Sequence, residues 1–327
     1  MLEPGDSAEC RDYAKLAFTL SEQFDTPVLL RTCTRVAHSQ SLVELFDREE
    51  CPLSEYTKNP AKFVMTPGNA IPAHVRVEQR TEALRQWNEN SPILKEEMGS
   101  GEWGIITSGI SYQYVKEALP DASVLKIGMV NPLPLERMAA FAKKVKKLAV
   151  VEELDPIMEE QLRAMGVHVD LGKKELGLLG EYSQSRIRAA FGIANPENQK
   201  LEEPLPVRPP VLCPGCPHRG LFHVLHKLKV RVSGDIGCYT LGNAMPLDMV
   251  DTCLCMGAGI TMAQGFHWVD PDGVCFSFVG DSTFFASGMT GVVNAVYNQA
   301  DMILCVLDNS TTAMTGHQPH PGTGRNM

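Results

Sequence analysis

The 327-residue sequence predicts an α/β protein built on parallel sheets with helices on both faces. Short apolar runs alternate with amphipathic segments from residue 103 to 191, and again from residue 217 to 307. Strands that alternate with helices indicate βαβ units, whose sheets are parallel and buried on both sides. A hydrophobic content of 44% is enough for two cores of ordinary domain size.

The first hundred residues do not complete a domain. Residues 7–24 have a helical apolar face with Asp6 and Ser7 as possible caps, and residues 28–31 are typical of a buried strand. One helix and one strand cannot enclose a core, so residues 1–46 are predicted to be the end of an α/β domain. Residues 47–100 are polar and contain five prolines, so they are predicted to be a connector, helical only at 73–87.

Residues 101–200 are predicted to form one α/β domain. Four strands are expected, at 103–107, 124–129, 148–152 and 167–171. Four helices are expected, at 111–119, 135–145, 156–165 and 181–191. A proline-rich stretch at 202–210 then predicts a linker.

Residues 205–327 are predicted to form a second α/β domain. Its strands are expected at 230–233, 249–253, 274–279 and 302–307, and its helices at 217–228, 258–268 and 286–297. The sequence stops in a loop rich in glycine and proline, where a doubly wound domain would need further elements. We therefore expect this domain to be truncated at its C-terminus, and the chain to be cut at both ends.

Composition excludes several classes of protein. A net charge of −9 argues against nucleic acid as a partner. No apolar run approaches the roughly 18 residues of a membrane span, and the polar N-terminus lacks the apolar core of a signal peptide. The chain is therefore predicted to be cytoplasmic, where its ten cysteines are expected to be thiols or metal ligands.

The most informative stretch joins two strand ends. One apolar strand ends in Gly280, Asp281 and Ser282, and the next ends in Asp308 and Asn309. Parallel strands joined by a helix place both ends on one edge of the sheet, where ligands of open α/β sheets bind. A carboxylate and an amide oxygen suit Mg²⁺, which also binds substrate phosphates. Gly280 would let a diphosphate approach the backbone.

This pattern resembles the thiamine diphosphate motif. With the segments 212–220 and 314–324, and with 26–31 and 151–156, the chain resembles the 2-oxoacid:ferredoxin oxidoreductases. Within that family it is most similar to the alpha subunit of the indolepyruvate type. The resemblance covers essentially all 327 residues and corresponds to a middle portion of that subunit.

The resemblance implies thiamine diphosphate and Mg²⁺ as cofactors, and three-layer parallel-sheet domains of the transketolase-like type. Mg²⁺ would be bound by Asp281, Asn309 and the backbone carbonyl of Thr311. The remaining residues expected at the cofactor are Cys216, Cys238, Met256, Gly257, Gly280, Ser282 and Thr283. His218 is the catalytic candidate, as a contact to substrate or diphosphate. Residues 1–46 would end a pyrimidine-binding domain, 101–200 would match the C-terminal domain of transketolase, and 205–327 would bind the diphosphate.

The pair Cys213 and Cys216 allows three interpretations. With Cys238 the pair could hold a [4Fe–4S] cluster, although four thiolates are the usual set. It could be a thioredoxin-like redox pair. It could also line the cofactor site as metal-free thiols, which we favour. The clusters of the resembled subunit lie in a C-terminal ferredoxin-like segment that this chain lacks.

The function implied is oxidative decarboxylation of aryl pyruvates such as indolepyruvate to the acyl-CoA, with ferredoxin as electron acceptor. The partners implied are a smaller beta subunit, ferredoxin, coenzyme A and the aryl pyruvate. The alternatives are a non-oxidative thiamine-dependent decarboxylase or synthase, and an inactive fragment that only binds a partner or cofactor. Because the pyrimidine-binding domain and the ferredoxin-like segment would be missing, we expect this chain alone to be inactive.

Overall fold

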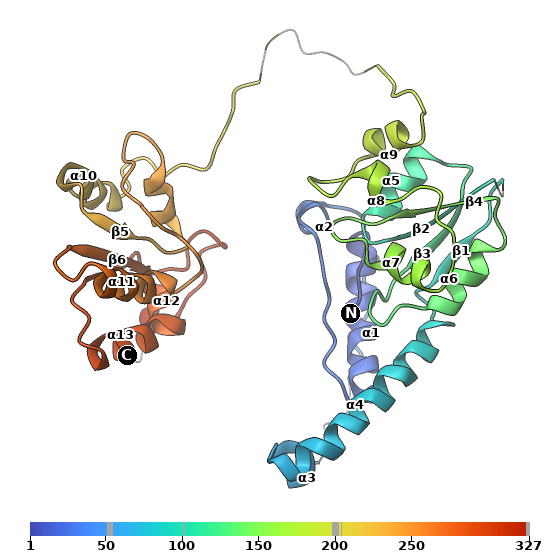
Figure 1. Cartoon of the computed structure of the whole chain (residues 1–327), viewed down its shortest axis with the longest axis horizontal. Coiled ribbons are helices and arrows are strands. Elements are labelled where there is room, and N and C mark those ends of the chain that lie inside the picture. The colour runs from blue at the N-terminus through green and yellow to red at the C-terminus, as the bar shows by residue number, and fades with distance from the viewer. Residues whose placement is uncertain (51–54, 101, 198–202, 204, 325–327) are drawn as a thin grey trace. The chain divides into compact units, whose positions relative to one another are not determined.

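The computed structural model describes residues 1–50, 55–100, 102–197, 203 and 205–324. The chain divides into two compact units, Met1–Gln199 and Lys200–Met327. Each unit contains a sheet of mainly parallel strands with helices on both faces, as Figure 1 shows, so the predicted α/β fold class is confirmed. In the part of the chain that the model describes, helices long and apolar enough to cross a membrane are absent.

The sheet of the first unit has the strand order β1-β3-β2-β4. Its parallel strands are β2 (Trp103–Ser108), β3 (Ser123–Ile127) and β4 (Lys147–Val151). The edge strand β1 (Lys95–Glu97) pairs antiparallel with β3, within the stretch that the sequence predicted as a connector. Alternate residues face opposite layers, since Ile105 and Ile106 belong to two different core clusters.

One layer of helices consists of α5 (Ser111–Ala118), α8 (Lys173–Leu176) and α9 (Gln184–Ala190). The opposite layer consists of α6 (Leu135–Ala142) and α7 (Ile157–Ala164).

The N-terminal segment packs on this unit. It contains α1 (Ser7–Phe24) and α2 (Thr34–His38), and α3 (Pro60–Phe63) and the long α4 (Pro67–Asn88) follow. Asp6 caps α1 by accepting from the Glu9 amide at 2.9 Å, as expected. Apolar residues of α1 and Leu2 are buried against Ile93 and Met129, whereas Phe18 remains 78% exposed. The sequence predicted that the apolar surface of residues 1–46 would pack on a sheet absent from this chain. In the structure, part of that surface is buried against the first unit instead. The assignment of 1–46 to another domain stays a prediction.

The second unit has the strand order β5-β6-β7, all parallel. The strands are β5 (Arg231–Ser233), β6 (Cys275–Gly280) and β7 (Ile303–Leu307). Helix α10 (His218–Leu228) packs on the same core cluster as the short 3₁₀ helix Cys238–Asn243. Helices α11 (Ala258–Val269) and α13 (Met289–Tyr297) pack together, and α12 (Asp281–Thr283) leads through a π turn at Phe284–Gly288 into α13. After β7, the last helical turn in the described residues is a 3₁₀ turn at Pro321–Thr323.

Three predicted strands are wrong, because each reduces to a single bridge. They are 28–31, 167–171 and 249–253, which bridge at Leu30, Leu171 and Thr252. In the last two, an aspartate carboxylate accepts a hydrogen bond from a backbone amide of the neighbouring strand. Asp170 accepts from the Leu148 amide at 2.8 Å, and Asp251 accepts from the Val232 amide at 2.6 Å. A side-chain acceptor of this kind ends the ladder after one position. The predicted linker at 202–210 lies partly outside the described residues.

Candidate cofactor site

A cavity of about 370 Å³ lies in the second unit, at the carboxyl ends of β6 and β7. Eight residues predicted for the cofactor line it: Cys238, Met256, Gly280, Asp281, Ser282, Thr283, Asn309 and Thr311. The loop after β7 completes the wall with residues 312–315. Cys216, Gly257 and His218 do not line the cavity.

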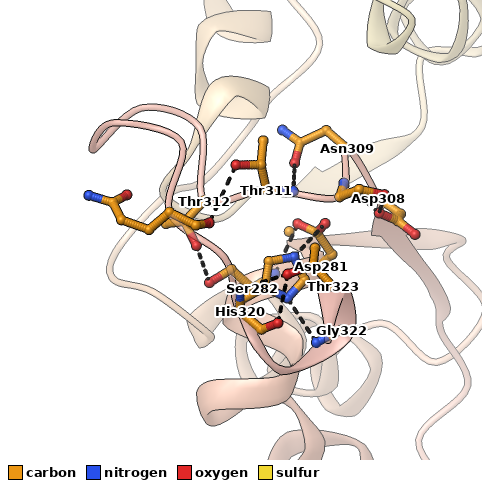
Figure 2. A network of polar contacts seen from close by, with 12 residues as sticks. Asp281, Ser282, Asp308, Asn309, Thr311, Thr312, His320, Gly322 and Thr323 are labelled. Carbon is orange, nitrogen blue, oxygen red and sulfur yellow. Dashed lines mark hydrogen bonds and ion pairs between the residues drawn. The ribbon is translucent and has the colours of Figure 1, made fainter. Parts of the chain in front are cut away.

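Asp281 is a buried carboxyl group at this edge of the sheet. It follows β6 directly and is only 5% exposed. Its Oδ1 accepts from the Ser282 amide at 2.9 Å, and its Oδ2 lies 3.0 Å from Nε2 of His320 (Figure 2). Each oxygen retains a free lone pair, so the carboxylate is still able to bind a cation.

The end of β7 brings a second carboxylate, which the sequence interpretation left out. Asp308 accepts from the Ser310 amide at 2.7 Å. That bond, followed by the Asp281 side chain, lowers the pKa of Asp308. Asn309 forms an Asx turn, with its Oδ1 accepting from the Thr311 amide at 3.2 Å (Figure 2). The Asp-Asn pair at the strand end was the only signal that could have indicated Asp308.

Tyr239 explains why residue 280 is a glycine. Its hydroxyl accepts from the Gly280 amide at 2.9 Å and donates to the carbonyl of Ile236 at 2.9 Å. A Cβ atom at position 280 would meet that hydroxyl oxygen at 2.8 Å. Burial raises the pKa of Tyr239 to about 12, so the phenol stays protonated. Tight packing under the turn thus requires glycine, while the predicted approach of a diphosphate stays a prediction.

Asp235 positions the other wall of the cavity, and sequence reasoning missed it. This fully buried residue accepts from the Gly257 amide with both oxygens, at 2.9 and 2.8 Å, and from the Ile236 amide at 2.8 Å. Burial raises the pKa of its carboxyl. Gly257 has φ 89°, a conformation that favours glycine. The two bonds from Gly257 hold the turn that presents Met256 to the cavity.

His218 lies beside the site rather than on its wall. It is the first residue of α10, is 8% exposed, and its ring lies 6.0 Å from that of Phe222. Burial lowers its pKa, and nearby Asp281 partly opposes that shift. The imidazole is therefore neutral at pH 7.

The three cysteines considered as cluster ligands, Cys213, Cys216 and Cys238, lie near one another. Cys216 and Cys238 pack on one core cluster, and Cys213 is exposed. Burial, then Cys216 and Cys213, raise the pKa of the Cys238 thiol. Among the described residues, groups of three or more His, Cys, Asp or Glu side chains arranged to hold a metal are absent. An Asp, Asn and carbonyl site is of a different type, and the role of the cysteines stays a prediction.

Comparisons with known proteins agree with this geometry. Residues 235–327 match the family of thiamine pyrophosphate enzymes, at its C-terminal TPP binding domain. Over 99% of its length the chain is 39% identical to the indolepyruvate oxidoreductase subunit IorA of Archaeoglobus fulgidus. The corresponding subunits of Methanothermobacter marburgensis and Pyrococcus abyssi are 38% and 35% identical over 98% and 99% of the chain. The predicted resemblance is confirmed.

The chain spans little more than half of these relatives, namely 56% of the first two and 57% of the third. A solved 2-oxoglutarate:ferredoxin oxidoreductase of Magnetococcus marinus matches 39% of this chain and 23% of its own, with 17% identity and a TM-score of 0.31. That likeness is too slight to carry an argument.

Proposed function

We propose that this relative of the IorA subunits binds thiamine diphosphate and Mg²⁺ in the cavity of its second unit. The observation that carries the proposal is the meeting of two strand ends at one cavity, with Asp281 from the first and Asn309 and Thr311 from the second. The match of residues 235–327 to a TPP binding domain supports the same site.

The donor set fits a hard divalent cation. Asp281 offers a carboxylate, Asn309 an amide oxygen and Thr311 a backbone carbonyl, and Mg²⁺ prefers such oxygen ligands. Asp308 adds a second carboxyl group beside Asp281, whose side chain helps to lower the pKa of Asp308.

The other residues of the wall fit a diphosphate and a ring. The hydroxyls of Ser282 and Thr283 would donate to phosphate oxygens, and Cys238 and Met256 would contact the apolar part of the cofactor. When bound, thiamine diphosphate supplies the carbon nucleophile and electron sink needed to decarboxylate a 2-oxo acid. His218, neutral at pH 7, would contact substrate or diphosphate from outside the lining. Cys216 and Gly257 would support the wall from behind.

At the level of the whole protein, we propose oxidative decarboxylation of aryl pyruvates to acyl-CoA with ferredoxin as acceptor, in the cytoplasm. The names of the IorA relatives support indolepyruvate as substrate and imply a second subunit. The iron–sulfur clusters would belong to a longer polypeptide than this chain.

Two measurements test these proposals. Isothermal titration of the 327-residue chain with thiamine diphosphate should show uptake with Mg²⁺ and none with a chelator. Indolepyruvate-dependent viologen reduction, measured with coenzyme A on the longer subunit and its partner, tests the oxidative activity. Decarboxylation without viologen reduction would instead support a non-oxidative enzyme.

A further inference from the structure

The polar pair Asp281 and His320 joins the cavity to the last described turn of the chain. The two residues are 39 positions apart, and their side chains are only 7% and 4% exposed. Nε2 of His320 lies 3.0 Å from Oδ2 of Asp281, so a buried imidazole contacts the proposed metal ligand directly (Figure 2).

The surroundings of His320 fix its orientation and its tautomer. Its ring stacks on Phe285, with ring centres 6.2 Å apart at an angle of 28°. The Gly322 amide donates to Nδ1 at 3.1 Å. Because Nδ1 is an acceptor, the proton resides on Nε2 and is donated to Asp281. A Cβ atom at position 322 would meet the Phe285 ring at 2.5 Å, so glycine is needed for this packing.

The same loop is fastened at a second point. Residues 309–324, the closing loop, form a bridge between Thr312 and Gln318, and the Thr312 hydroxyl donates to that of Ser282 at 2.8 Å. Both hydrogen bonds, from His320 and from Thr312, end on neighbouring residues of the turn after β6, Asp281 and Ser282. Since Thr311 to Thr315 form one wall of the cavity, the loop is both a wall of the site and a partner of its carboxylate.

We propose that His320 is a positioning residue for the metal ligand Asp281, holding one carboxylate oxygen while it fastens the closing loop over the cofactor. This inference rests on the proposed function of the cavity. Carboxylates that bind metals are themselves hydrogen-bonded, and these outer partners set the orientation of the ligand. Docking of the loop and binding of Mg²⁺ with the diphosphate are then one coupled event.

The test is a titration of Mg²⁺ into the 327-residue chain at a fixed excess of thiamine diphosphate. His320→Phe keeps a ring on Phe285 but removes the donor, and should raise the Mg²⁺ concentration needed by about 10- to 100-fold. Excess Mg²⁺ should restore full uptake, which a simple loss of folding would not allow. His320→Gln keeps an N–H donor and should recover most of the affinity.

Matched controls separate the possible failures. His317→Asn changes an exposed histidine of the same loop, at φ 59°, a conformation that asparagine adopts, and should leave the Mg²⁺ requirement unchanged. His320→Asn repeats the loss of the bond with a short polar side chain, in case the phenylalanine variant does not fold. Hydrogen exchange without cofactor should be faster over 311–318 in the donor-less variants and unchanged in β6.

The outcomes are distinct. Wild-type chain without Mg²⁺-dependent uptake would overturn both the proposed function and this inference. A second outcome would overturn the inference alone: Asp281→Ala abolishes cofactor uptake, but the His320 variants without an N–H donor need no more Mg²⁺ than the wild type. A glutamine variant as impaired as the phenylalanine variant would overturn it too.

Discussion

The two units both bury carboxylates beside a parallel sheet, and they surround them differently. In the first unit Glu9 pairs with buried Lys126 and, at 3.1 Å, with Lys95, while Glu3 pairs with Arg31 at 3.3 Å. In the second unit Asp281 is equally buried, and among the described residues its side-chain hydrogen-bond partner is the imidazole of His320.

A buried carboxylate that pairs with a buried lysine holds two elements of the fold together. The Lys126 ammonium lies over the Tyr112 ring and joins β3 to α1 through Glu9. A buried carboxylate without a lysine or arginine partner costs desolvation energy, which backbone hydrogen bonds offset at Asp235 and which a bound cation would offset at Asp281. The difference supports the structural role of the Glu9–Lys126 pair and the proposed binding of a cation at Asp281.

The largest expected effect is that of Asp281→Ala. Removing the carboxylate should abolish Mg²⁺-dependent binding of thiamine diphosphate while the fold survives, because the small side chain leaves no unpaired charge. Titration calorimetry measures the affinity, and circular dichroism checks the fold. Asp272→Ala, at an exposed position of the same unit, should bind as the wild type does. Unchanged affinity for thiamine diphosphate in Asp281→Ala would contradict the proposal that the buried carboxylate of the second unit binds Mg²⁺.

The next largest effect concerns the matched charge. Lys126→Met should destabilise the first unit by about 3–5 kcal/mol, because it leaves the buried Glu9 without its main partner. Denaturant-dependent hydrogen exchange resolves the two units, and cofactor binding by the second should not change. The exposed Lys146→Met is the control. Adding Glu9→Gln should restore part of the stability, and a full loss in the double variant would contradict the ion-pair explanation.

A smaller effect is expected from Tyr239→Phe. The variant leaves the buried Gly280 amide and the Ile236 carbonyl without their partner, which should cost about 1–3 kcal/mol in the second unit. Tyr297→Phe, at a side chain that is 85% exposed, should have no measurable effect on the unfolding free energy. Equal stability of the two variants would show that the hydroxyl of Tyr239 does not support the turn.

The smallest effect is a dependence on acid. The Lys116 ammonium, and then the Tyr112 hydroxyl, lower the pKa of Glu97 below its ordinary value of 4.5. The unfolded chain therefore binds the proton more readily, so the stability contributed by Glu97 is present above 4.5 and is lost as pH falls through the lowered pKa. The unfolding free energy of the first unit should drop less between about pH 6 and pH 3 in Glu97→Gln than in the wild type. The same dependence of unfolding free energy on pH in both proteins would contradict the stabilising role of Glu97.

Much of the site could be predicted from sequence because it depends on strand ends. Parallel strands bring their carboxyl ends to one edge whatever else the chain does, so Asp281 and Asn309 were predicted from the strand ends, and Thr311 was added by the family resemblance. The helices and main strands followed from periodicity for the same local reason. Cys238 and Met256 came from the family resemblance, and the structure places both on the cavity wall.

Contacts between distant side chains could not be predicted in this way. Asp170 and Asp251 replaced two expected ladders with side-chain hydrogen bonds, although both stretches have strand-like composition. Lys126 lies inside an apolar strand pattern, and only the packing of α1 against β3 supplies the carboxylate that allows its burial.

The sequence by itself determined the α/β class and the sheet edge at which Asp281 and Asn309 meet, because these depend on local periodicity and on strand direction. Only the tertiary structure decided that His320 contacts Asp281, that Asp235 holds the Gly257 turn and that Tyr239 underlies Gly280. Each of these contacts joins residues from separate elements, and their partners are set by how the layers pack rather than by any spacing along the chain.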